Sequence, residues 1–152
     1  MGQQQLLLVI LVVIIVGLTT IIAMNIMGRG ADNANRDAVR QDLASAAAYA
    51  QELWARPSIM DGADKNFTTL ESAVILEKLR IMGTINEEEE TVTNENGTYS
   101  ITSSESQLTI TGVPSSGGED IQTIVCYDNT NSAWRMNTGS PEADTPEGCS
   151  DD

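Results

Sequence analysis

The 152-residue chain contains no histidine. Histidine is the commonest general base in enzymes, the usual activator of a nucleophilic serine or cysteine, and a frequent zinc ligand. Cations are also scarce, since eight lysines and arginines stand against 22 aspartates and glutamates, for a formal net charge of −14. A chain this acidic repels the phosphates of nucleic acids. We therefore expect a protein that is not an enzyme, holds no cofactor and does not bind nucleic acid directly.

Cysteine is limited to Cys126 and Cys149, which lie in a region rich in serine, threonine and asparagine. An even number of cysteines in such a region is typical of a disulfide in an exported protein. We expect the two residues to be joined, so that the polar C-terminal tail is tied to a strand. Two reduced thiols are the alternative.

The longest uncharged run covers residues 6–24 and reaches the length of about 20 residues that a helix needs to cross a bilayer. Three interpretations compete: a signal peptide, an ordinary membrane anchor, and a helix that moves from the membrane into a polymer. A signal peptide begins with basic residues and has a shorter apolar core. An ordinary anchor has cations on its cytoplasmic side, whereas Arg29, the nearest cation here, follows the run. A short basic leader removed just before Met1 would explain the missing positive flank.

Residues 31–56 change to an amphipathic pattern that predicts a helix ended by Pro57. The glycines at 28 and 30 mark a weak point before it. We therefore divide the chain into an apolar helix over residues 1–28, an amphipathic continuation over residues 29–57 and a globular head over residues 58–152. The apolar stripe of the amphipathic part recurs at spacings of three and four residues and consists of Val39, Leu43, Ala46, Ala47, Ala50, Leu53 and Trp54.

The head is predicted to contain a short helix followed by antiparallel strands, which makes the fold class α+β. A capping-box pattern at residues 68–71 predicts a helix over about residues 69–82, closed by Gly83. Strands are expected at residues 91–93 and 98–101 on either side of a turn at 94–97, around Leu108 and Ile110, at 121–127 and at 133–136.

Taken together, these segments resemble a type IV pilin: a membrane-like helix that continues into an amphipathic helix packed on an antiparallel sheet, with a disulfide-closed tail. The resemblance covers the whole architecture, and about the first thirty residues carry it at the level of motif. It implies cleavage by a prepilin peptidase and methylation of the new N-terminus, Met1. A cut that leaves Gln3 first is the alternative. The family usually has a glutamate at the fifth mature position, where this chain has Gln5, which the resemblance makes an assembly contact.

The resemblance implies a major pilin that polymerises with copies of itself into an extracellular filament at the cell surface. Before assembly the subunit would lie in the cytoplasmic membrane, and its partners would be the peptidase and the pilus assembly machinery. Adhesion, motility and DNA uptake are uses to which such filaments are put. The alternatives are a pseudopilin of a type II-like secretion system and a membrane-anchored surface binding protein.

Two further kinds of site are suggested by short patterns. The glutamate run at residues 87–90 offers calcium ligands, but such a run is more often a solvated loop, and we expect no metal. Asn66-Phe67-Thr68 and Asn96-Gly97-Thr98 match the acceptor pattern for N-glycosylation. Because this pattern also arises by chance, Asn66 and Asn96 stay candidates.

Overall fold

The computed structural model describes residues 2–141, 146 and 149. It divides into two compact units, residues 1–34 and residues 35–152, which we describe separately. Helix α1, Gly2–Ala55, supplies all the described structure of the first unit and continues into the second. The second unit includes residues 35–57 in addition to the head predicted over residues 58–152, and "the head" denotes residues 35–152 from here on. It contains a six-stranded antiparallel sheet and a short helix α2, Ser72–Lys78. The predicted α+β class is therefore confirmed.

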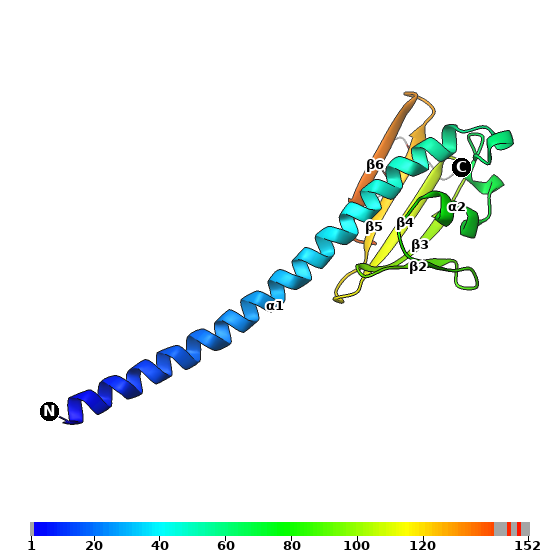
Figure 1. The fold of residues 1–152 in the computed structure, drawn as a ribbon. Coiled ribbons are helices and arrows are strands. Elements are labelled where there is room, and N and C mark those ends of the chain that lie inside the picture. Colours follow the sequence, from blue (N-terminus) through cyan, green and yellow to red (C-terminus); the bar gives the residue numbers. More distant parts are fainter. Residues whose placement is uncertain (1, 142–145, 147–148, 150–152) are drawn as a thin grey trace. The chain divides into compact units, whose positions relative to one another are not determined.

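The strands of the sheet pair in the order in which they occur in the chain, β1-β2-β3-β4-β5-β6, and every neighbouring pair is antiparallel (Figure 1). Each connection is thus a hairpin or a short loop. The turn predicted at residues 94–97 joins β2 to β3, and each of the five predicted strand regions lies in a strand. The bounds are β1 Thr84–Asn86, β2 Thr91–Thr93, β3 Gly97–Ser103, β4 Gln107–Pro114, β5 Ile121–Asp128 and β6 Ala133–Gly139.

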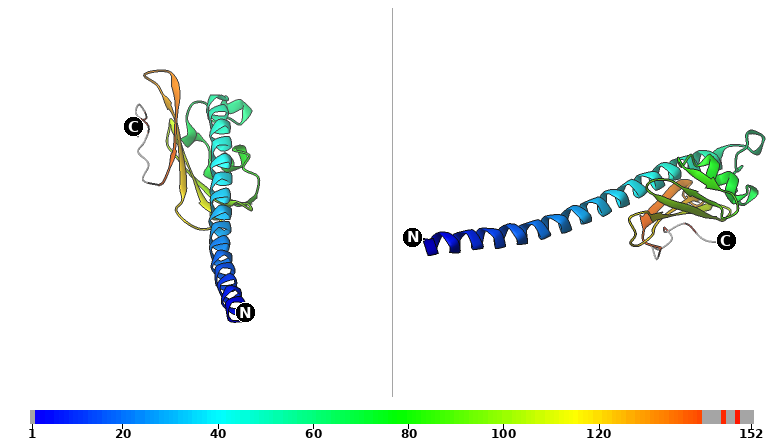
Figure 2. Two further views of the ribbon diagram at one scale, coloured as in Figure 1. Left: turned by 90° about the vertical axis from the view of Figure 1, so that its left-hand side faces the viewer. Right: turned by 60° about the horizontal axis from the view of Figure 1, so that its bottom comes forward.

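Residues 35–55 of α1 lie along one face of the sheet (Figure 2). All seven residues of the predicted apolar stripe are buried there. All of them except Ala47 share one core with the alternate residues of the strands that face the helix, among them Tyr99, Leu108 and Ile110. Ile75 and Leu79, from α2 and its end, join the same core. At the end of α1, Trp54 packs on Tyr127 and Trp134 with ring centroids 4.4 and 5.3 Å away.

The helix approaches the sheet closely at Gly112 of β4. A Cβ atom at this position would lie 2.7 Å from Cγ1 of Val39 and 3.2 Å from the Tyr99 ring. Carbon atoms at van der Waals contact are about 3.5–4.0 Å apart. Glycine is therefore required at this position by the packing of Val39 rather than by its own backbone conformation.

The second helix differs from its prediction, because α2 covers seven residues and not about 69–82. Asn66 rather than the capping box begins the preceding 3-10 helix η2, Phe67–Thr69, by accepting a hydrogen bond from the backbone of Thr68. Glu71 is extended and separates η2 from α2. Arg80 has a left-handed φ of 55°, the conformation that commonly ends a helix. Gly83 instead meets β2, where a Cβ atom would lie 2.9 Å from Cγ1 of Val92.

Candidate functional site

The first candidate site is the apolar segment, defined as residues 6–27 of α1. Every leucine, isoleucine, valine and methionine in it is exposed, by between 49% and 76%. Within the described chain, α1 is the one helix long and apolar enough to cross a membrane. A signal sequence passes the same test of length and composition, so the segment indicates membrane association or export.

The polar side chains of the apolar segment bond to their own helix. The Thr19 hydroxyl donates to the carbonyl oxygens of Ile15 and Val16 at 3.0 and 2.9 Å, and Thr20 donates to Val16 at 2.8 Å. Asn25 donates its Nδ2 to Ile21 at 3.3 Å. Such bonds satisfy polar groups without water. The segment therefore presents a surface that fits apolar surroundings on all sides.

The two residues that the pilin resemblance singles out lie just before this segment. Gln5 is an exposed residue of α1, and its side chain makes no hydrogen bond to the part of the chain that the structure describes. Its amide is accordingly available to another molecule. The predicted processing and methylation site, Met1, lies outside the described residues.

The first residues of the head are fixed to two loops of the sheet. Asn35 donates its Nδ2 to the carbonyl oxygen of Asn96 at 2.9 Å and accepts from the hydroxyl of Ser116 at 2.9 Å. Arg36 donates to the carbonyl oxygen of Glu119 at 3.1 Å. The β2–β3 turn and the β4–β5 loop thus both hold α1 where it enters the head.

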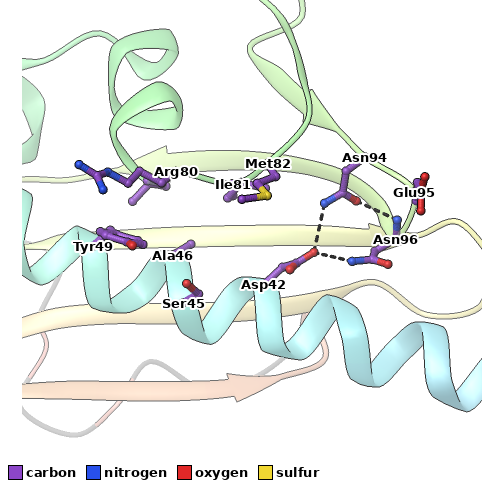
Figure 3. A pocket seen from close by; sticks show the side chains of 11 residues that line it. Asp42, Ser45, Ala46, Tyr49, Arg80, Ile81, Met82, Asn94, Glu95 and Asn96 are labelled. Atoms are coloured by element: carbon purple, nitrogen blue, oxygen red, sulfur yellow. Dashed lines mark hydrogen bonds between the residues drawn. The ribbon is translucent and has the colours of Figure 1, made fainter.

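The second candidate site is a polar cluster around Asp42 on α1 (Figure 3). Oδ2 of Asp42 accepts hydrogen bonds from the Tyr99 hydroxyl at 2.6 Å, from Asn96 Nδ2 at 2.8 Å and from Asn94 Nδ2 at 3.1 Å. Oδ1 of Asn94 in turn accepts hydrogen bonds from the backbone amides of Asn96 and Gly97. The cluster therefore ties the helix to β3 and to the turn that precedes it.

The hydrogen bonds of the cluster shift two pKa values in opposite directions. Partial burial raises the pKa of Asp42, but the bonds from Tyr99, Asn96 and Asn94 together outweigh it, so the pKa lies below its ordinary value. Burial and the hydrogen bond to the Asp42 carboxylate raise the pKa of Tyr99. Asp42 is therefore a carboxylate held in its ionised form by hydrogen bonds rather than a base ready to take a proton. This arrangement gives the cluster a structural role.

An open cavity of about 510 Å³ lies next to Asp42. It is bounded by one side of α1, by the residues that follow α2 and by the β2–β3 turn. The Arg80 guanidinium lies over the Tyr49 ring, 5.3 Å from its centroid, and Met82 is 88% exposed at the rim. The lining residues are Asp42, Ser45, Ala46, Tyr49, Leu79, Arg80, Ile81, Met82, Asn94, Glu95 and Asn96. This set offers no nucleophile held by a base.

The two expected cysteine partners are joined, with Cα atoms 6.0 Å apart. Cys126 is buried on β5, so the disulfide fixes Cys149 of the tail to the sheet. Two residues further on, Asp128 is fully buried and accepts hydrogen bonds from Thr130 and Asn131 in the β5–β6 turn and from Arg135 on β6. The bonds from Asn131 are the main reason why the pKa of Asp128 lies below its ordinary value.

The remaining predicted positions are separated in the head. The glutamates at residues 87–90 are exposed in the β1–β2 turn. Across the described residues, no three histidine, cysteine, aspartate or glutamate side chains come together in a way that could hold a metal ion. Asn66 lies at the start of η2, whereas Asn96 belongs to the Asp42 cluster.

Comparison with known proteins does not assign a family, because no family model, no curated protein and no solved structure matches the chain. The long apolar helix, the antiparallel sheet and the disulfide are consistent with a pilin-like fold.

Sequence reasoning did not anticipate the Asp42 cluster. Its one signal was the place of Asp42 between Val39 and Ala46, next to Leu43 of the apolar stripe. A carboxylate at the edge of a buried stripe requires hydrogen-bond donors. The donors come from residues 52, 54 and 57 positions later in the chain, so local spacing could not identify them.

Proposed function

We propose that this chain is the structural subunit, a major pilin, of an extracellular type IV pilus-like filament. The observation that carries the proposal is the exposure of every large apolar side chain in residues 6–27. An amphipathic helix on a protein surface keeps one polar face, and a helix that is apolar all round is buried. The segment therefore requires partners on every side, which lipid supplies before assembly and a bundle of identical helices supplies afterwards.

The energetics favour assembly through this segment. Burial of apolar surface contributes about 25 cal/mol per Å². Thr19, Thr20 and Asn25 make hydrogen bonds within the helix, so their side chains would keep a partner when the segment is buried in the bundle. Gln5 contributes a hydrogen bond to a neighbouring subunit, and by the pilin resemblance Met1 is the processed and methylated end.

The head faces the medium in this proposal. Its acidity keeps neighbouring filaments apart and soluble. Its disulfide suits an oxidising exterior. The pilus assembly machinery and a prepilin peptidase are the further partners, and the subunit lies in the membrane before assembly.

The test is negative-stain microscopy of material sheared from the surface of cells that make the chain. Long filaments that contain this subunit as their main component, and that disappear when the chain is deleted, are the expected result. Abundant chain with only short periplasmic assemblies would identify a pseudopilin. Chain that sediments only with membranes, and never as fibres without detergent, would identify an anchored binding protein. Either of these two results overturns the proposal.

A further inference from the structure

The two Asn-x-Thr motifs of the head lie in different surroundings. In N-linked glycosylation the amide nitrogen Nδ2 of asparagine becomes bonded to the sugar, so a folded acceptor must tolerate a large group on that atom. What Nδ2 contacts in each motif therefore distinguishes the two.

The Nδ2 atom of Asn96 is already committed to the Asp42 cluster. It donates to Oδ2 of Asp42 at 2.8 Å, in a part-buried bond. The backbone oxygen of the same residue accepts from Ser115 at 2.8 Å and from Asn35 at 2.9 Å. Its motif threonine, Thr98, bonds to Thr93 instead of to Asn96. A sugar on Asn96 would displace the bond that joins this turn to α1.

The motif at Asn66 has the opposite arrangement. Its Oδ1 accepts from the Thr68 hydroxyl at 2.6 Å and from the Thr68 backbone amide at 2.8 Å. Nδ2 of Asn66 bonds to no described residue and is not among the buried unpaired atoms, so solvent reaches it. Between the two, Phe67 is fully buried and fixes the motif to the head. Thr68 itself is exposed.

We propose that Asn66, and not Asn96, is an N-glycosylation acceptor. The donor is an oligosaccharide whose anomeric carbon is linked to a lipid pyrophosphate. A bond forms between Nδ2 and the anomeric carbon while the bond from that carbon to the pyrophosphate oxygen breaks. The oxygen leaves with the electron pair, and a base of the transferring enzyme takes one Nδ2 proton. The inference uses the exposure of the head outside the cell, and does not depend on polymerisation.

The test is mass spectrometry of the full chain purified from the cells that produce it. Trypsin cleaves after Lys65 and Lys78, so Asn66 falls in the peptide of residues 66–78, whereas Asn96 falls in the peptide of residues 81–135. We expect an oligosaccharide mass on the first peptide and none on Asn96. Fragmentation that preserves the sugar linkage assigns the mass to Asn66 rather than to a hydroxyl of the same peptide.

Three variants complete the test. Asn66→Gln and Thr68→Val should remove the added mass, while Thr68→Ser, which keeps the hydroxyl, should retain it. Intact disulfide in each variant shows that the head has folded. A wild-type peptide of residues 66–78 found without added mass overturns the inference, and so does added mass on Asn96. Filaments seen by microscopy in either case leave the proposed function standing, so the two failures are distinguishable.

Discussion

The Asp42 carboxylate on α1 accepts the hydroxyl hydrogen of Tyr99 on β3, with 2.6 Å between the two oxygen atoms. This bond joins the helix to the middle of the sheet. It also links the stability of the head to pH at both ends of the scale, because it lowers the pKa of one partner and raises that of the other.

Asp42 should make the head less stable in acid. Its pKa is lower when folded than unfolded, so its contribution is present above the unfolded value of about 3.9 and is lost as the pH falls through the folded value. Asp42→Asn should cost about 1–3 kcal/mol at pH 7 and flatten the dependence below pH 5. Denaturant unfolding of the full chain in detergent, followed by tryptophan fluorescence, measures both. An unchanged acid slope would contradict this role, although Asp128 should leave part of the slope in place.

Tyr99 should give a matching effect in alkali. Its pKa is raised on folding, so its contribution is complete below the unfolded value of about 10 and is lost as the pH rises above it. Tyr99→Phe should lower stability by about 1 kcal/mol at neutral pH and remove the alkaline loss. Tyr127→Phe is the control, since the Tyr127 hydroxyl bonds to none of the described residues. Equal alkaline curves for the two variants would argue against the assignment.

Gly112→Ala should destabilise the head because the new methyl group would meet Val39 at 2.7 Å. Overpacking of this kind costs about 1–3 kcal/mol. Gly30→Ala is the matched control, since a Cβ atom there meets nothing within 4 Å and alanine favours helix. The two midpoints of denaturant unfolding give the answer. A Gly112→Ala variant as stable as the control would mean that α1 can shift on the sheet without loss.

Val13→Asp should abolish filaments and leave the subunit in the membrane, because it would put an unpaired charge among the apolar helices. Val13 is 65% exposed in the single chain, so no contact within the subunit is lost. Val13→Ile should assemble normally. Surface filament yield at matched expression is the measurement. Normal yield from Val13→Asp would exclude a bundle built on this segment.

Gln5→Ala filaments should still form, with stability lower by about 1 kcal/mol per subunit for one lost hydrogen-bonding group. Gln5→Lys should be far worse, since it would set a second cation beside the amino terminus of a neighbouring subunit. Gln4→Lys adds the same charge one residue away and serves as the control. Filament yields of the three variants at matched expression decide the point. If Gln5→Ala fails as completely as Gln5→Lys, Gln5 is a specific contact and apolar cohesion alone does not hold the filament.

The parts of the fold that repeat a local pattern could be predicted from sequence. The buried stripe from Val39 to Trp54 follows from helical spacing, and strands β2 to β6 were expected from short β-forming runs bounded by turns. In contrast, β1 has three exposed residues of which only Ile85 is apolar, so no alternating pattern indicates a strand there. Its pairing with β2 is what makes it a strand.

Positions set by distant contacts could not be predicted. Gly83 was interpreted as the end of a helix, but its space is limited by the carbonyl oxygen of Thr93 and by Val92, both on β2. The capping pattern at residues 68–71 was overridden because Asn66 bonds to Thr68 and begins an earlier turn. The Asp42 cluster likewise depends on the β2–β3 turn returning to the helix, which no local spacing encodes.

The chain-order pairing of the sheet has a consequence for how the head forms. Because each strand pairs with the next one in the chain, every step of sheet formation closes only a short loop. Folding rates rise as contacting residues become closer in sequence. The sheet can therefore grow strand by strand from β1 to β6, and the docking of residues 35–55 and the closing of the disulfide are the steps that span longer separations. We therefore expect the sheet to form quickly and to spend little time with unpaired strand edges open to aggregation.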